Sequence, residues 1–356
     1  MIIMKTDALP EQITEVIHEI KRHGLRADII NGEFRTVIGI IGDERNVDFN
    51  RLHNMPGVKE VFRIETPYKL ISREYDRLSE PNKHFSVTVG DVEIGGEKPV
   101  YLAGPCTIES REQLFRIAEG VKKAGAHILR GGVFKPRTSV YSFQGLGASG
   151  EEEARAALSW LRDAGKQFGM PVVTEVRGEA QVDLVAEYID ILQIGARNMY
   201  DQDLLTKVAQ KRKPVLLKRH FGASVEEFLS FAEYIAAEGN RDIILCERGI
   251  VPIGKGKSFT RYTLDLGSVP AMQKETFLPV IVDPSHAAGR RDLIFNMSCA
   301  AIASGACALM IEVHYNPAEA LVDGQQMITP DELKETIEAC NRVHQVMMTG
   351  NIKSAV

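Results

Sequence analysis

The sequence predicts an α/β protein, a (β/α)8 TIM barrel with a small N-terminal ferredoxin-like (βαββαβ) domain. Residues 1–70 show the order strand, helix, strand, strand, helix, strand that is typical of ferredoxin-like units. From residue 99 onward, eight short apolar segments alternate with helical patterns over about 250 residues, the length of such a barrel. We therefore expect a small domain at 1–70, a linker and β-hairpin at 71–98, and a barrel at 99–356.

The N-terminal elements follow from hydrophobic spacing. Pro10 suits the first turn of a helix, and the apolar residues at 13, 16, 17 and 20 form one stripe on it. Asn31-Gly32 predicts a hairpin turn between strands at 25–30 and 36–41. A first strand at 2–4, a short helix near 47–54 and a last strand at 58–64 complete the unit. RNA-binding versions of this fold stack bases on aromatic residues of the central strands, and these strands have none, which argues against RNA.

The larger part of the chain shows a regular strand-and-helix rhythm. A polar linker around 73–83 precedes a hairpin at 85–97, where apolar residues alternate between Gly-containing turns. Capping boxes begin helices at Ser110, Ser224 and Thr329. An open doubly wound sheet is the rival fold, but no Gly-x-Gly-x-x-Gly follows the first strand. The eight barrel strands are expected at 100–103, 127–130, 171–175, 191–194, 214–218, 242–246, 279–282 and 308–313.

Composition restricts the function classes. The 356 residues include 43 Lys and Arg against 48 Asp and Glu, a formal net charge of −5, so a nucleic-acid coat is not expected. Five cysteines without a Cys-x-x-Cys pair do not form a disulfide framework. We find neither a signal peptide nor an apolar run of about 18 residues, so we expect no membrane contact and a cytoplasmic location.

Cations gather at the predicted strand ends, where active sites of such barrels form. Because the whole chain is acidic, this positive charge is local and predicts an anionic ligand such as a phosphate or carboxylate. Salt bridges to acidic residues at the barrel mouth are the alternative. The cations are Arg130, Lys135, Arg137, Arg197, Lys218 and Arg248, with Arg219 as a further candidate.

A second group of residues has the chemistry of metal ligands. Cys106 follows the first strand, His286 the seventh, and Glu312 and Asp323 lie in and after the eighth. These strands are neighbours in a closed barrel, and thiolate, imidazole and carboxylate together suit a divalent transition ion. Taken singly, Cys106 is also typical of a small buried residue and His286 of a core histidine. Glu175 is a candidate for proton handling or for orienting a cation.

At this point the residues resemble a known family. The stretches 104–106, 129–132, 135–139, 141–145, 194–198, 217–219, 246–249 and 283–286 are similar to those of 3-deoxy-D-arabino-heptulosonate 7-phosphate (DAHP) synthases, through residues 99–346. The N-terminal unit resembles the appended domain of the feedback-regulated Iβ branch. The resemblance implies a metal-dependent condensation of phosphoenolpyruvate with erythrose 4-phosphate, the first step of the shikimate pathway.

The resemblance also implies roles for the residues at the strand ends. Lys135, Glu175, Cys106 and His286 are expected to be catalytic. The expected metal ligands are Cys106, His286, Glu312 and Asp323, around one divalent ion that could be Mn, Fe, Co or Zn. Arg130 and Lys135 would face the carboxylate of phosphoenolpyruvate, and Glu175 would lie near its phosphate. That phosphate would be held by Ala196, Arg197, Lys218 and Arg248. Arg137, Thr138 and Ser139 would receive erythrose 4-phosphate.

Two alternatives remain open at the level of sequence. A related synthase could use another aldose phosphate such as arabinose 5-phosphate, although Pro136-Arg137 favours the four-carbon sugar phosphate. A non-catalytic sugar-phosphate sensor is the other alternative, and retention of the candidate metal ligands argues against it. The chain departs from the family pattern at His220, at Ala287-Ala288 and over residues 250–262, which bears on the aldehyde side.

The small domain holds no catalytic candidate. We therefore expect it to regulate the barrel by binding an aromatic amino acid, tyrosine or phenylalanine, at a domain or subunit interface. A domain that only assembles the oligomer is the alternative. The family resemblance implies a homotetramer.

Overall fold

The computed structural model describes residues 1–31, 36–62, 66–73, 85–136, 141–252 and 259–349. The chain divides into two compact units. One comprises Met1–His84 with Glu275–Phe277, and the other comprises Phe85–Lys274 with Leu278–Val356. No helix among the described residues is both long and apolar enough to cross a membrane.

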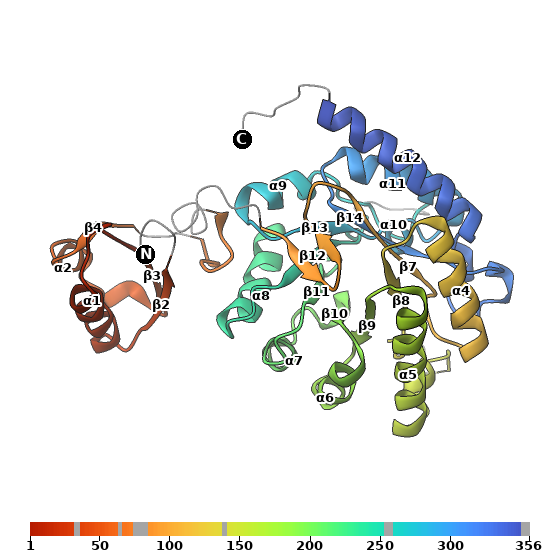
Figure 1. Ribbon diagram of the computed structural model, residues 1–356, viewed down its shortest axis with the longest axis horizontal. Helices are drawn as coiled ribbons and strands as arrows, with labels where there is room; N and C mark the ends of the chain where they lie inside the picture. The colour runs from red at the N-terminus through yellow and green to blue at the C-terminus, as the bar shows by residue number, and fades with distance from the viewer. Residues whose placement is uncertain (32–35, 63–65, 74–84, 137–140, 253–258, 350–356) are drawn as a thin grey trace. The chain divides into compact units, whose positions relative to one another are not determined.

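The N-terminal unit is ferredoxin-like, as predicted (Figure 1). Its antiparallel sheet has the strand order β2-β3-β1-β4. The predicted turn at Asn31-Gly32 and the end of the last predicted strand extend outside the described residues. The elements in chain order are β1 (Ile2–Met4), α1 (Pro10–Arg22), β2 (Arg26–Asn31), β3 (Thr36–Ile41), η1 (Glu44–Asn46), α2 (Phe49–His53) and β4 (Val58–Val61).

The stripe on α1 explains how this unit folds. Pro10 occupies the first turn, where a missing N–H is harmless, and Gly24 follows the helix with φ of 74°. Val16 and Ile20 are buried against Ile2 and Ile38 of the two central strands. The helix therefore covers one face of the sheet, and apolar burial stabilises the unit.

The larger unit contains a closed barrel of eight parallel strands (Figure 1). Five predicted strands begin one residue later than expected. Three of these begin directly after Pro171, Pro214 and Pro279, because proline has no N–H to donate to the ladder. The strands are β7 (Val100–Gly104), β8 (Ile128–Arg130), β9 (Val172–Val176), β10 (Ile191–Ile194), β11 (Val215–Lys218), β12 (Ile243–Glu247), β13 (Val280–Val282) and β14 (Ala308–Glu312).

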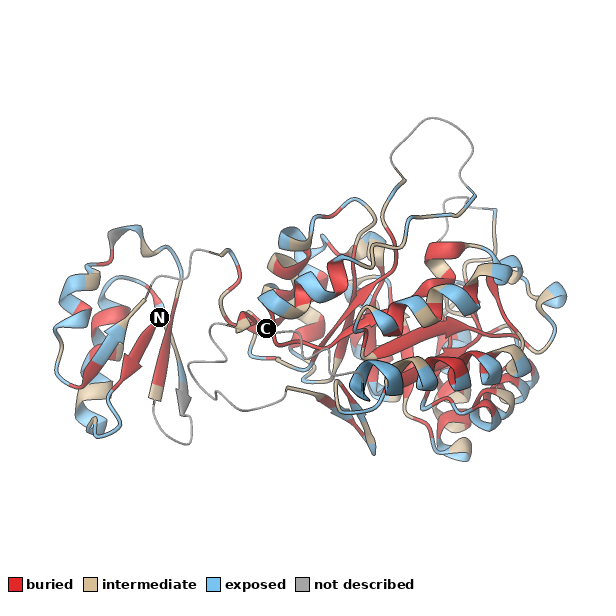
Figure 2. Cartoon of the chain, turned by 90° about the horizontal axis from the view of Figure 1, so that it is seen from above, coloured by how far each residue is buried: buried red, intermediate tan, exposed pale blue. Residues whose placement is uncertain are grey.

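Helices lie around the outside of this barrel (Figures 1 and 2), so the strands are buried on both faces. They are α4 (Arg111–Ala124), α5 (Glu151–Phe168), α6 (Glu179–Tyr188), α7 (Gln202–Ala209), α8 (Val225–Ala237), α9 (Ser268–Glu275), α10 (Pro284–Ala288), α11 (Ile294–Ala303) and α12 (Pro330–Thr349). Short 3-10 turns lie in the connections, at η2 (Leu146–Ala148), η3 (Ala196–Asn198), η4 (Arg291–Leu293), η5 (Pro317–Glu319) and η6 (Gly324–Gln326).

Two of the three predicted capping boxes are complete. Ser224 and Glu227 exchange both bonds at the start of α8, and Thr329 and Glu332 do so at α12. At α4 the prediction is half wrong. Ser110 accepts from the N–H of Gln113, but the Gln113 side chain accepts from the N–H of Glu109 instead of Ser110.

A predicted hairpin closes the N-terminal end of the barrel interior. It consists of β5 (Val87–Val89) and β6 (Val92–Ile94). Val87, Val89 and Ile94 belong to the same buried apolar cluster as the first residues of the barrel strands, among them Ile128 and Ile191. Because this end is filled with apolar side chains, a ligand can enter only at the opposite end of the strands.

Candidate active site

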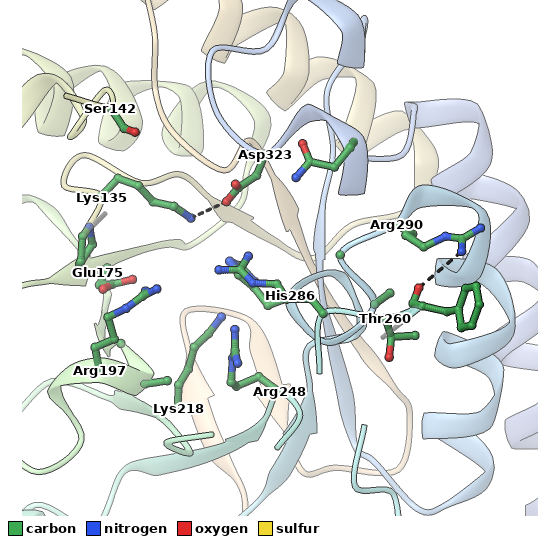
Figure 3. A pocket seen from close by; sticks show the side chains of 18 residues that line it. Lys135, Ser142, Glu175, Arg197, Lys218, Arg248, Thr260, His286, Arg290 and Asp323 are labelled. Atoms are coloured by element: carbon green, nitrogen blue, oxygen red, sulfur yellow. Dashed lines mark hydrogen bonds and ion pairs between the residues drawn. The ribbon is translucent and has the colours of Figure 1, made fainter. Parts of the chain in front are cut away.

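A cavity of about 870 Å³ opens at the C-terminal ends of the barrel strands (Figure 3). Most of its charged side chains are cations; of the two carboxylates, Asp323 lies to the right of Lys135 and Glu175 below it in the view of Figure 3. Such a lining favours an anionic ligand. The residues predicted from the sequence that line it are Lys135, Glu175, Ala196, Arg197, Lys218, Arg248, His286 and Asp323.

At the cavity lie the four candidate metal ligands. One ligand atom from each of Cys106, His286, Glu312 and Asp323 lies within 4.8 Å of the others. The set combines one thiol sulfur, one imidazole nitrogen and two carboxylate oxygens. This donor set and its spacing fit a single divalent transition ion.

Cys106 lies where the first strand meets the second. A Cβ on Gly104, which has φ of 155°, would lie 2.0 Å from the carbonyl oxygen of Arg130, so only glycine lets β7 approach β8 this closely. The Cys106 sulfur lies 2.7 Å from Lys135 Nζ and 3.5 Å from Asp323 Oδ2. Burial and the nearby Glu312 charge raise the pKa of this thiol well above its ordinary value, so a bound cation would be needed to deprotonate it.

Helix α10 fixes the orientation of His286. Asp283 caps this helix by accepting from the N–H of His286 at 2.9 Å, and its other oxygen lies 2.7 Å from His286 Nδ1. The second ring nitrogen, Nε2, lies 3.3 Å from Glu312. Burial lowers the pKa of His286 to about 4, outweighing the nearby carboxylates, so the imidazole is neutral at neutral pH and can act as a ligand.

Asp283 also contacts Lys218, the last residue of strand β11. It accepts a hydrogen bond from Lys218 Nζ, and both side chains are buried. Although burial acts in the opposite direction, His286 and Lys218 hold the pKa of Asp283 well below its ordinary value. One carboxylate therefore links a candidate metal ligand to a cation that lines the cavity.

Glu312 is buried completely and has a partner on each oxygen. Arg130 Nη1 donates to Oε1 at 2.5 Å, and Gln326 Nε2 donates to Oε2 at 2.6 Å. Burial opposes ionisation, but His286, Arg130 and Lys135 lower the pKa of Glu312, so the group is a carboxylate at neutral pH. Arg130 contacts Glu312 and the Cys106 carbonyl, beside the cavity, and is not among the residues that line it.

Lys135 carries its positive charge between two candidate ligands. Its Nζ lies 2.7 Å from the Cys106 sulfur and 3.3 Å from Asp323 Oδ2. Burial acts to lower its pKa, but the nearby Cys106 and the carboxylates of Glu312 and Asp323 raise that pKa above the ordinary value. At neutral pH Lys135 is therefore an ammonium that can donate a proton or a hydrogen bond.

Comparisons with known proteins agree with this geometry. Residues 76–349 match the model of the DAHP synthetase I family, and residues 1–66 match the DAHP synthase ferredoxin-like domain. The chain belongs to the DAHP synthetase I family. Its activity is that of a 3-deoxy-7-phosphoheptulonate synthase, a transferase of the shikimate pathway that condenses phosphoenolpyruvate with erythrose 4-phosphate.

Similar proteins of the family cover nearly the whole chain. The phospho-2-dehydro-3-deoxyheptonate aldolase of Thermotoga maritima is 45% identical over 96% of this chain and 97% of its own length. The crystal structure of that Thermotoga DAHP synthase aligns with a TM-score of 0.74 at 43% identity, covering 97% of both chains. A 2-dehydro-3-deoxyphosphooctonate aldolase of Bartonella henselae is more distant, 32% identical over 73% of this chain and 95% of its own length.

In this DAHP synthetase I barrel, Arg197 follows the fourth strand and Arg248 follows the sixth. Arg197 lies in η3, and Figure 3 shows its side chain beside Glu175. Gln193 donates to Glu175 at 3.0 Å, and a Cβ on Gly195 would lie 2.2 Å from a Glu175 oxygen, so the glycine makes room for this carboxylate. Arg248 is buried, and its Nη1 has no hydrogen-bond partner among the described residues.

Arg219, the further candidate among the predicted cations, has a different environment. It is buried and donates to Glu247 and Asp265, each at 2.9 Å, and to the carbonyl of Ala223. It does not line the cavity. The alternative of salt bridging at the barrel mouth therefore applies to Arg219.

Three predicted residues lie outside the described part of the chain, and two cations that were not predicted line the cavity. Arg137, Thr138 and Ser139 lie outside the described residues. Arg261 and Arg290, which were not predicted as site residues, add two cations to the cavity lining. Arg290 lies four residues after His286 and four before the start of α11, and this place after the seventh strand was the available signal.

Proposed function

We propose that phosphoenolpyruvate and erythrose 4-phosphate react in the cavity at the C-terminal end of the barrel. One observation supports this assignment above all: a Cys/His/Glu/Asp cluster lies beside a cavity whose charged lining is mostly cationic. The cluster is suited to one metal ion, and the cations are suited to two substrates that both carry negative charge.

Cys106, His286, Glu312 and Asp323 would hold the divalent ion of this family. Bound there, a Mn, Fe, Co or Zn ion would supply Lewis acidity toward the aldehyde oxygen of erythrose 4-phosphate. Asp283 keeps the His286 ring oriented through Nδ1, so that Nε2 faces Glu312. The identity of the ion does not follow from this donor set.

Arg197, Lys218 and Arg248 would hold the phosphate of phosphoenolpyruvate, with the backbone of Ala196 beside them. All four line the same cavity as Glu175. The unpaired Nη1 of Arg248 supports this role, because a buried guanidinium N–H without a partner is costly unless an anion accepts from it. Arg130 and Lys135 would face the carboxylate, and Lys135 would donate a proton or hydrogen bond during the reaction.

The bond changes follow from this arrangement. C3 of phosphoenolpyruvate forms a bond with the aldehyde carbon of erythrose 4-phosphate, water adds at C2, and phosphate leaves with cleavage of its C–O bond. The cations offset the repulsion between the two anionic substrates and hold their reacting carbons close together. Arg137, Thr138 and Ser139 would bind erythrose 4-phosphate from the segment that lies outside the described residues.

The N-terminal domain would regulate this reaction. We assign it residues 1–70, with residues 71–98 as linker and hairpin and 99–356 as the barrel, and we propose tyrosine or phenylalanine as the effector. A homotetramer in the cytoplasm is the proposed assembly. An inhibitor needs a coupling free energy of about 1–3 kcal/mol between its site and the substrate site. Deletion of residues 1–70 should remove inhibition by either amino acid, whereas loss of assembly alone would favour the structural alternative.

The decisive experiment compares two aldehydes with and without chelator. The full chain should consume phosphoenolpyruvate with erythrose 4-phosphate and lose this turnover after chelator treatment, with recovery on adding Mn²⁺, Fe²⁺, Co²⁺ or Zn²⁺ singly. Faster turnover with arabinose 5-phosphate would instead support the related synthase, the activity named for the Bartonella relative. Turnover that survives complete metal removal would contradict the metal assignment.

A further inference from the structure

The buried cations at the strand ends differ in what holds them. Arg130 is paired with Glu312, Lys218 with Asp283, and Arg219 with both Glu247 and Asp265. Arg248 is as deeply buried, about 5% exposed, yet no carboxylate of the described residues forms an ion pair with it. Without such a partner, other contacts must hold a long side chain in one rotamer, or it loses conformational entropy on binding a ligand.

An aromatic ring takes the place of the missing carboxylate. The Arg248 guanidinium carbon lies 4.1 Å from the centroid of the Tyr262 ring, within the range of a cation–π contact. A ring face attracts the guanidinium without accepting from its N–H groups. The donors of Arg248 therefore stay available for a phosphate, whereas a carboxylate would compete with that phosphate for them.

Tyr262 itself is fixed from three sides. Its N–H donates to the carbonyl of Ala287 at 2.8 Å, and its ring stacks on Phe221 with centroids 5.4 Å apart. A Cβ on Gly249, which has φ of 92°, would lie 2.7 Å from the Cβ of Tyr262 and 3.1 Å from that of Ala287. The tyrosine is thus packed directly against the turn that follows Arg248.

These contacts join two of the sequence departures noted above. Tyr262 ends the unusual stretch 250–262, and Ala287 belongs to the unusual Ala287-Ala288 pair. Backbone hydrogen bonds connect the two segments at Tyr262 and again at Arg261, whose N–H donates to Ala288 at 3.0 Å. Residues 261–262 and 287–288 therefore form one wall beside Arg248.

We propose that Tyr262 is a positioning residue that holds the Arg248 guanidinium in the orientation that binds the phosphate of phosphoenolpyruvate. The proposal rests on the phosphate-binding role of Arg248 given under the proposed function. It requires the ring and not the phenol hydroxyl, since the contact is with the ring face.

Steady-state kinetics of the full-length metal-loaded enzyme test the proposal. Tyr262→Leu should raise KM for phosphoenolpyruvate about fivefold to twentyfold, while kcat and KM for erythrose 4-phosphate change less than about twofold. Tyr262→Phe should keep all three constants within about twofold. Tyr234→Leu is the matched control: Tyr234 stacks on Phe231 on α8, is 39% exposed and does not line the cavity, so its loss should leave the constants unchanged.

A double-mutant cycle separates this proposal from the role of Arg248. If Tyr262 acts through Arg248, the double variant Arg248→Ala with Tyr262→Leu should show the same KM for phosphoenolpyruvate as Arg248→Ala alone. Additive effects, or a Tyr262→Leu enzyme with unchanged KM beside an impaired Arg248→Ala enzyme, would overturn the proposal and leave the proposed function intact. An Arg248→Ala enzyme with normal affinity for phosphoenolpyruvate would instead contradict the phosphate assignment.

Discussion

The two ends of the barrel are built from the same eight strands and are opposite in chemistry. At the N-terminal end, Val87 and Ile94 of the hairpin pack against strand residues such as Ile128 in a fully apolar cluster. At the C-terminal end, equally buried positions hold ionisable groups such as Glu312 and Asp283. Burying apolar groups stabilises a fold, whereas burying charges costs free energy unless they are paired. The apolar N-terminal end therefore stabilises the fold and offsets the free-energy cost of the buried charges at the C-terminal end.

Two cysteines provide the sharpest test of this comparison. Cys106→Ala removes one candidate metal ligand, so we expect activity to fall below about 1% of the parent enzyme while the fold is kept. The control is Cys307→Ala, because Cys307 packs against the apolar cluster and its thiol bonds only to the Val280 carbonyl among the described residues. Turnover and metal content per chain are measured for both. A chelator-treated Cys106→Ala sample with full activity would disprove the metal assignment.

Ile94→Ala tests the apolar N-terminal end of the barrel. Ile94 is completely buried in the hairpin that closes the barrel, so truncation leaves a cavity and should lower the free energy of unfolding by about 2–5 kcal/mol. Denaturant titration measures this loss. The kcat of the folded enzyme should stay within about twofold. A large fall in kcat with unchanged stability would show that the two ends are not divided as described.

Arg197→Ala and Lys218→Ala distinguish the two substrates. Each should weaken phosphoenolpyruvate binding by about tenfold to a hundredfold and affect erythrose 4-phosphate less, because each would remove a proposed charge-assisted bond to phosphate. Lys218→Ala should in addition lower stability, since it removes the ammonium that is paired with the buried Asp283. KM for each substrate and denaturation midpoints provide the comparison. Equal effects on both substrates would mean that the phosphates are assigned to the wrong cations.

Glu332→Gln tests a surface charge near the start of α12 and has the smallest expected effect. Partial burial acts to raise the pKa of Glu332, but hydrogen bonds from Arg291 and Thr329 keep it below the ordinary value. A lowered folded-state pKa stabilises the protein above the unfolded pKa of about 4.3 and loses that contribution as pH falls through the folded value.

The variant should therefore be less stable than the parent by about 0.5–1 kcal/mol at pH 7, with a smaller difference at about pH 3, below the unfolded pKa. Denaturant midpoints at both pH values check this. Glu335→Gln, an exposed position on the same helix, is the control. A difference that grows on acidification would have the wrong sign for this explanation.

Local patterns were enough to predict the fold. Apolar segments bounded by proline and glycine predicted the eight strands, and an apolar stripe beginning at Pro10 predicted α1. These signals are local because strand and helix periodicity depends on neighbouring residues. Errors were confined to element ends and to Gln113, whose side chain had two backbone N–H groups within reach.

The residues of the candidate site could be predicted from the sequence. The side chains that each of them contacts could not. Polar residues at the ends of parallel strands converge, so the sequence predicted that Cys106, His286 and Glu312 lie close together, as they do. Sequence could not distinguish the cations from one another. Arg219 and Arg248 both follow buried strands, yet one is held by two carboxylates and the other by the Tyr262 ring. Which partner a side chain meets depends on neighbouring strands and distant loops, and only the tertiary structure decided it.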